Sequence, residues 1–158
     1  MGVTRKMAGF AAVIAAVLGL SLATAGPAAA SGSLSWRNFG NTDPINSSGL
    51  SSWACATSVT IATDVVAQVC GIVAPDGVSV QAAVIVRNNR SSVYSVQTTM
   101  NLTDASTDEQ FWNEGCRPSG VGAHSWAVCF GFTEDWPFGP VFSHSFANDI
   151  FLGNSPNV

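Results

Sequence analysis

Apolar and polar residues alternate along the middle of the 158-residue chain in the pattern of β-strands. In the stretch 78–89, every even position up to Val86 is valine or alanine, whereas Ser79, Gln81 and Arg87 stand at odd positions. Alternate side chains of a strand point to opposite faces of its sheet. The stretch therefore predicts a strand with one face against a core.

The stretch 93–102 repeats the alternation, with an apolar even face that one threonine interrupts. The polar residues 88–92 between the two stretches include two asparagines, which tolerate the positive backbone angles of tight turns. We predict that 78–89 and 93–102 pair as an antiparallel hairpin.

Further strands are expected at 53–61, 124–133 and 141–146, with a brief edge strand at 34–39. In the first of these, Trp53 and Ile61 share a face, and we assign Trp53 to the core. The residues 65–73 are apolar at both odd and even positions, which is typical of a central strand covered on both faces. In the stretch 124–133, large apolar residues hold the even positions, and we expect them to face the core: Trp126, Val128, Phe130 and Phe132.

Six or seven short strands, separated by turns rich in glycine, proline, asparagine and aspartate, predict an all-β fold, arranged as an antiparallel β-sandwich. We place the sandwich domain at 53–158, after an irregular segment at 31–52. Only the acidic stretch 103–114 leaves room for one helical turn, and the apolar residues 150–152 fall in a tail after the last strand. A barrel is the alternative architecture, because the pattern does not decide whether sheet edges close.

The first thirty residues have the features of a secretory signal peptide. Arg5 and Lys6 precede an apolar run at 7–25, and small alanines lead to an expected cleavage site after Ala30. We therefore expect a secreted, extracellular protein. A retained membrane anchor is the alternative, since the apolar run is close to the shortest length that spans a bilayer.

Removal of Arg5 and Lys6 leaves four arginines, no lysine and ten carboxylates, which gives a formal net charge of −6. Nucleic-acid backbones and anionic lipids do not attract an acidic surface. The composition therefore disfavours nucleic acid and, after signal cleavage, membranes as partners. We expect a monomer or a weak homo-oligomer.

All four cysteines lie beyond the expected cleavage site, and an even number in an exported domain predicts two disulfides. Of the three possible pairings we favour Cys55 with Cys70 and Cys116 with Cys129, because each pair encloses a short segment. Cys70 shares its face with Gln68, so either that strand is buried on both faces or the bridge links elements that are not adjacent. The sequence lacks a Cys-x-x-Cys motif and a suitable histidine pair, so no metal or other cofactor is predicted.

His124 and His144 are the only imidazoles, and both stand next to serines. Adjacent strand residues point to opposite faces, and no Gly-x-Ser-x-Gly elbow is present, so adjacency alone does not make a nucleophilic dyad. The carboxylate pairs at 108–109 and 134–135 do not provide two carboxyl groups across a cleft, as glycoside hydrolysis requires. We predict structural histidines, solvated acidic loops and no catalytic residue.

The run Ala67-Gln68-Val69-Cys70, the stretch 80–89, and Cys116 and Cys129 with Gly-Val-Gly-Ala at 120–123 between them resemble small secreted actinobacterial proteins of unassigned activity. The order strand, asparagine-rich turn, strand, cysteine, glycine-containing loop and cysteine is similar to that of Ig-like extracellular repeat modules. This resemblance implies an Ig-like β-sandwich in the extracellular space and no catalytic residue. A second resemblance, in size and in having two disulfides, is to secreted actinobacterial inhibitors of subtilisin-type proteases, although no reactive-site motif matches.

Two loops are the best candidates for contacts with a partner, because loops carry many binding residues. One spans 117–123, and the other spans 134–140, where aromatic residues stand among glycine and proline. Exposed aromatic rings stack on sugars or form protein-binding patches. The candidate contact residues are Arg117, Pro118, Val121, Trp136 and Phe138.

The sequence thus favours a secreted, non-catalytic binding or surface-interaction module whose partner is an extracellular protein or glycan. A secreted protease inhibitor is the second hypothesis. A secreted hydrolase is the third, and it requires a cleft in which a histidine meets both a serine hydroxyl and a carboxylate.

Overall fold

The structure is a computed structural model that describes residues 32–47 and 49–158. The signal peptide expected at 1–30 lies outside the described residues. The described part of the chain forms thirteen β-strands and no α-helix, which confirms the all-β prediction, although the strands are more numerous than the six or seven expected. Within this part, no helix is long and apolar enough to cross a membrane.

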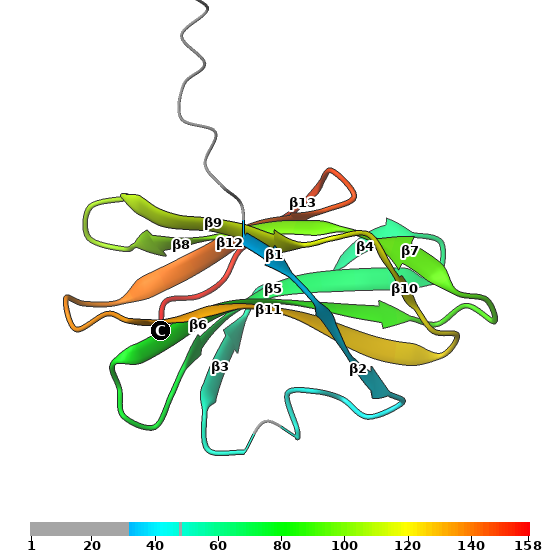
Figure 1. Cartoon of the computed structure of the whole chain (residues 1–158), viewed down its shortest axis with the longest axis horizontal. Coiled ribbons are helices and arrows are strands. Elements are labelled where there is room, and N and C mark those ends of the chain that lie inside the picture. Colours follow the sequence, from blue (N-terminus) through cyan, green and yellow to red (C-terminus); the bar gives the residue numbers. More distant parts are fainter. Residues whose placement is uncertain (1–31, 48) are drawn as a thin grey trace, which may run out of the picture.

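Two larger sheets lie in two layers (Figure 1). The five-stranded sheet contains, in spatial order, β1 (Gly32–Leu34), β9 (Gln110–Cys116), β8 (Thr98–Asp104), β12 (Val141–Ala147) and β13 (Ile150–Asn154). The six-stranded sheet contains β2 (Trp36–Gly40), β11 (Ser125–Asp135), β6 (Ser79–Asn88), β5 (Val65–Val73) and β3 (Ser52–Cys55), with β4 (Val59–Ala62) also pairing with β5. A small sheet pairs β7 (Tyr94–Val96) with β10 (Ser119–Val121). The strand pairs are antiparallel except for β1 and β9, which run parallel.

Apolar residues from both larger sheets meet in one core. β5 and β6 supply Val69 and Val84, and β8 supplies Leu102, all of them fully buried. The disulfide between Cys116 and Cys129 joins β9 of one sheet to β11 of the other. The shared core and this covalent bridge hold the two sheets against each other.

Both predicted disulfides are present. Cys55 on β3 lies directly opposite Cys70 on β5. β5 is buried on both faces, as predicted for 65–73, and Cys70 belongs to a second apolar cluster on the outer face of the sheet. Gln68 is only partly buried, and its Oε1 accepts a hydrogen bond from Ser58 Oγ over 2.8 Å. Of the two alternatives left open by the sequence, burial of this strand on both faces is therefore correct, and the bridge links adjacent strands.

The predicted hairpin between 78–89 and 93–102 is wrong. β6 pairs with β5 and β11, whereas residues 94–104 supply β7 and β8, which belong to the two-stranded and five-stranded sheets. The chain is held where it leaves β6 by the fully buried side chain of Asn88. Its Nδ2 donates over 2.8–3.0 Å to three backbone carbonyl oxygens, those of Ser92, Val121 and Gly122. These bonds stabilise a crossing between layers instead of a tight turn.

The stretch 53–61, expected as one strand, is divided into β3 and β4. The break at 56–58 reverses which face the odd residues occupy: Trp53 lies on the outer face, whereas Ile61 points into the core between the sheets. The edge strand expected at 34–39 is likewise divided, because β1 lies at the edge of one sheet and β2 at the edge of the other.

Two segments after β8 form strands that the sequence did not predict. The stretch 103–114 begins with one turn, closed by the Asp108 N–H donating to Asp104 O over 2.9 Å, and continues as β9. The tail residues 150–152 belong to β13, which returns against β12. Asn148 and Asp149 make that reversal with φ angles of 45° and 64°, as two-residue hairpin turns require.

The even-numbered residues of β11 do not face the core between the sheets, contrary to the prediction. Ala127 and Cys129 face that core, whereas Trp126, Val128 and Phe130 lie on the outer face. The six-stranded sheet is therefore apolar on both faces. Its outer face carries the candidate site.

Candidate binding site

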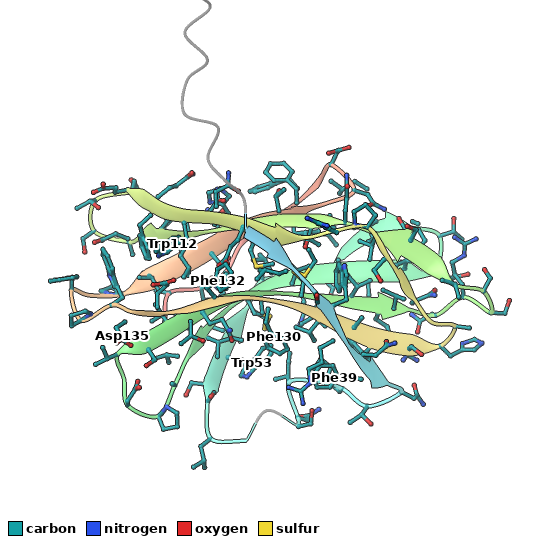
Figure 2. The ribbon with its side chains drawn as sticks, in the orientation of Figure 1. Phe39, Trp53, Trp112, Phe130, Phe132 and Asp135 are labelled. Carbon is teal, nitrogen blue, oxygen red and sulfur yellow. A yellow bond between two sulfur atoms is a disulfide. The ribbon has the colours of Figure 1, made fainter. Side chains whose placement is uncertain are left out.

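Four aromatic residues gather on the outer face of the six-stranded sheet, and we term this surface the outer aromatic face. They are Phe39 from β2, Trp53 from β3, and Trp126 and Phe130 from β11. Figure 2 shows Phe39, Trp53 and Phe130 on the side of β11 that points away from the five-stranded sheet. The rings rest on a base of buried residues, namely Cys70, Ile72, Ala83, Ile85 and Val128.

Phe130 is the central ring of this surface. Its centroid lies 5.8 Å from that of Trp53, with the planes at 76°, and 6.4 Å from that of Phe39, with the planes at 51°. In the strand register Phe130 stands opposite Ala83, whose small side chain leaves space above the sheet. Edge-to-face and tilted pairs of this kind stabilise each other by about 0.5–1.5 kcal/mol. The three rings therefore form one packed aromatic cluster.

A hollow of about 230 Å³ opens beside these rings. Its apolar wall includes Phe39, Trp53 and Phe130, and its polar groups include Arg37, Ser51 and Gln81. Arg37 is the only charged residue that lines it. The hollow thus combines flat apolar surfaces with hydrogen-bonding groups, as ligand pockets do.

Gln81 presents an oriented amide to this hollow. Its Nε2 donates over 2.7 Å to Gly131 O and over 3.3 Å to Thr133 Oγ1. Within the described part of the chain, its Oε1 accepts no hydrogen bond. The side chain is therefore anchored by its nitrogen and has a free acceptor.

None of the four arginines at 37, 87, 90 and 117 forms an ion pair within residues 32–47 and 49–158, although ten carboxylates are present. The Arg37 guanidinium lies 5.2 Å from the centroid of the Phe39 ring, and that of Arg87 lies 5.3 Å from the Trp126 ring. Such distances are within the range of cation–π attraction. Two unpaired cations therefore lie on the outer aromatic face.

A β-bulge at Gly131 and Phe132 lies next to the hollow and interrupts the pairing of β11 with β6. Gln81 holds the bulge from the outer face through Gly131 O, and Glu114 Oε2 accepts from the Phe132 N–H over 2.7 Å on the inner side. The bulge also explains why Phe132, expected in the core, is 49% exposed. The position of Phe130 beside the hollow is thus tied to a buried carboxylate.

Glu114 is 2% exposed, and its Oε1 has no hydrogen-bond partner among the described residues. Burial raises the pKa of the Glu114 carboxyl above its ordinary value, the hydrogen bond from Phe132 opposes that rise, and the charge of Glu134 adds to it. Gly131 has no space for a side chain, because a Cβ there would collide with Glu114 Oε1. Glutamate at 114 and glycine at 131 are therefore structurally coupled.

The loop candidates at 117–123 are split between surface and core. Arg117 and Pro118 are exposed and line a second hollow, of about 350 Å³, together with Phe146 and Asp149. Val121 is 1% exposed and belongs to the core. Its side chain is not available to a partner, and the expectation that it makes a contact is corrected.

The loop at 134–140 presents one aromatic residue to solvent. Trp136 stacks on Phe111, with centroids 4.1 Å apart and planes at 5°, and Phe138 meets Trp136 edge-on at 5.1 Å. Phe138 is 75% exposed, whereas the Trp136 indole nitrogen is buried. Phe138 is thus available for contact, and Trp136 supports it.

The two histidines have different surroundings. His124 occupies an exposed turn with a φ of 49°. The His144 Nε2 lies 2.8 Å from Asn101 Nδ2 and 3.3 Å from Gln110 Nε2, and burial lowers the pKa of His144. Two amide donors and a lowered pKa both favour neutral imidazole. Among the described residues, neither ring hydrogen-bonds to a serine or an acid.

Sequence reasoning placed Trp53 and Phe130 in the sandwich core and did not single out Arg37. A signal was present in the central strand 65–73, which is apolar on both sides and therefore implies a cover on its second face. Gln81, a polar residue at an odd position of the neighbouring strand, lies at the edge of this second apolar layer.

Comparisons with models of known protein families, with curated proteins and with solved structures find no match for this chain. Within residues 32–47 and 49–158, no group of three or more histidines, cysteines, aspartates or glutamates is arranged to hold a metal ion.

Proposed function

We propose that the chain is a secreted, non-catalytic binding module with an Ig-like β-sandwich fold. The two-layer arrangement, the shared core and the disulfide between β9 and β11 support the sandwich. Two disulfides are typical of proteins in oxidising, extracellular compartments, and this supports secretion.

The ligand that best fits the outer aromatic face is a saccharide. A sugar ring has an apolar face of C–H groups and a rim of hydroxyls, so its site needs an aromatic surface beside hydrogen-bonding groups. The hollow provides Trp53 and Phe130 beside the Arg37 guanidinium and the Gln81 amide oxygen. Its volume of about 230 Å³ suits one sugar unit. This hollow is the observation that carries the proposal.

Isothermal titration calorimetry with a galactose tetrasaccharide and a galacturonic acid tetrasaccharide tests this function. We expect at least one of them to bind with 1:1 stoichiometry, and Trp53→Leu to weaken that binding by about tenfold or more, because one aromatic surface of the hollow is lost. Trp112→Leu is the matched control, since Trp112 is 44% exposed on β9 in the other sheet.

A second variant, Ser51→Tyr, fills the hollow without removing a core side chain, because Ser51 lines the hollow outside the buried cluster. It separates loss of the site from loss of the fold. Unchanged binding in both Trp53→Leu and Ser51→Tyr, or equal weakening in Trp112→Leu, would count against the hollow as the binding site.

Protein contact through the loop at 134–140 is a second candidate function. The specific observation is Phe138, which is 75% exposed and supported edge-on by Trp136. Immobilised protein is expected to capture a partner from culture medium, and Phe138→Ala is expected to abolish the capture. Phe151→Ala is the matched control, since Phe151 is 50% exposed on β13. Equal capture by the Phe138 variant would remove this candidate.

A further inference from the structure

The charge of the outer aromatic face differs from that of the chain as a whole. The residues after the expected cleavage site carry four arginines against ten carboxylates. The hollow nevertheless includes Arg37 and no carboxylate among its lining residues. A site for a neutral sugar does not require a cation there.

We propose that the saccharide bound at the hollow is an anionic one, a chain of uronic acids whose carboxylate is held by Arg37. This inference rests on the proposed function, and it names the chemical class of the ligand.

Arg37 is free to make that contact. Its side chain is exposed, its one described interaction is with the face of Phe39, and none of its five N–H donors is engaged by the described residues. A guanidinium matches a planar carboxylate through two parallel hydrogen bonds, and such charge-assisted pairs are about twice as strong as neutral ones. Stacking on Phe39 restricts the orientation of the guanidinium before a ligand arrives.

Arg87 provides a second cation on the same face. Its Nε donates to Asn89 Oδ1 over 2.7 Å and its Nη1 donates to His124 O over 3.0 Å, which leaves Nη2 without a partner among the described residues. Arg37 lies opposite Val128 of β11 on one side, and Arg87 lies opposite Trp126 on the other. Two inter-strand spacings of about 4.8 Å across the sheet, and an offset of two residues along β11, about 7 Å, therefore separate the two positions. A chain with repeated carboxylates can reach both arginines, whereas a single uronic acid reaches only one.

The acidity of the whole chain opposes this ligand only weakly under physiological conditions. At about 0.15 M salt the Debye length is about 8 Å, so distant carboxylates are screened. A carboxylate in direct contact with Arg37 is screened much less. The charge of Arg37 therefore determines the preference for an anionic over a neutral saccharide.

The test compares a galacturonic acid tetrasaccharide with its fully methyl-esterified form by calorimetry at 0.15 M salt. The two probes share their rings and differ in charge. We expect the acid to bind at least tenfold more tightly than the ester, and Arg37→Gln to remove that difference. Arg37→Lys is expected to be intermediate, because it keeps the charge and loses the planar fork. Arg87→Gln is expected to weaken the tetrasaccharide but not monomeric galacturonic acid.

Arg117→Gln is the matched control, because it changes the net charge equally at an exposed residue that lines the other hollow. Equal affinity for acid and ester, with Trp53→Leu weakening both, would overturn the anionic ligand and leave the saccharide function standing. Equal effects of Arg117→Gln and Arg37→Gln would overturn the role of Arg37. Absence of binding by both probes, with the galactose tetrasaccharide still bound, would overturn this inference alone. Absence of binding by all three saccharides would overturn the saccharide function together with this inference.

Discussion

Replacement of Glu114 by alanine is expected to destabilise the protein by about 2–3 kcal/mol at neutral pH. The Phe132 N–H would lose the carboxylate that accepts its partly buried hydrogen bond at 2.7 Å. A fully buried orphan donor costs about 1–3 kcal/mol, so the lower part of that range applies here. Loss of packing by a side chain that is 2% exposed adds about 0.8 kcal/mol per methylene. Glu114→Gln keeps an oxygen acceptor and the side-chain volume, so it is expected to cost less than Glu114→Ala.

The stability difference between the natural protein and Glu114→Gln is expected to depend on pH. Because burial raises the folded pKa of Glu114 above its unfolded value, the folded protein keeps this proton to higher pH than the unfolded chain does. This contribution to stability is therefore present below the unfolded pKa and is lost as pH rises through the folded pKa. The glutamine in Glu114→Gln does not titrate, so this variant does not lose stability in that way. As the pH rises from about 4 to neutrality, its free energy of unfolding is therefore expected to increase relative to that of the natural protein.

Urea unfolding at several pH values measures both effects, since the free energy of unfolding follows from linear extrapolation. Two results would refute the reasoning. One is a Gln variant as unstable as the Ala variant at pH 7, which would mean that Glu114 does not satisfy the bulge. The other is a parallel pH dependence of the natural protein and Glu114→Gln, which would mean that the buried carboxyl does not titrate abnormally.

Three further predictions concern elements that position the site. Gly131→Ala is expected to lower the free energy of unfolding by about 1–3 kcal/mol through overpacking against Glu114, and by less in the Glu114→Ala background, in a double-mutant cycle by urea. Replacing Cys55 and Cys70 together by serine is expected to cost about 3 kcal/mol for a 15-residue loop, measured as a lower urea midpoint. Asn88→Ala is expected to cost about 2–4 kcal/mol, because three hydrogen bonds to backbone carbonyl oxygens are lost, one of them buried and two partly buried. For any of these variants, a thermal midpoint within about 2 °C of that of the natural protein would contradict the estimate.

Local periodicity predicted the strands that form the centre of the fold. The side-chain period of two is a property of the backbone, so the stretches 78–89 and 124–133 were recognisable without knowledge of their partners. The stretch 65–73 was recognisable by its apolar residues on both faces. The disulfide pairing followed from short separations along the chain. Periodicity does not name the neighbouring strand, and the hairpin of 78–89 with 93–102 was therefore wrong.

The candidate site was harder to predict because its residues have the same sequence pattern as core residues. Phe130 alternates along β11 as a core residue does, and only the pairing of β11 with β6 shows that it lies on the outer face above Ala83. Trp53 was assigned with Ile61 to one face, and the break at 56–58 separates them. Such a break changes no composition or charge, so the sequence alone does not reveal it.

Charge and hydrogen bonding at the site depend on contacts between distant segments. The anchor of Gln81 on Gly131 joins residues 50 positions apart, and Glu114 reaches Phe132 across the two sheets. The exposure of Phe138, by contrast, followed from its place in a loop rich in proline and glycine. The position of Phe138 in a loop can be recognised from the local sequence. The hollow depends on which residues of neighbouring strands lie opposite each other, which the local sequence does not reveal.

A two-dimensional amide NMR titration with the galacturonic acid tetrasaccharide tests the central claim most directly. We expect chemical-shift changes concentrated at Phe39, Trp53 and Phe130, including the Trp53 indole N–H. In Arg37→Gln we expect the same changes to need about tenfold more ligand. Shifts confined to Phe138, or the absence of shifts at the outer aromatic face, would contradict the account.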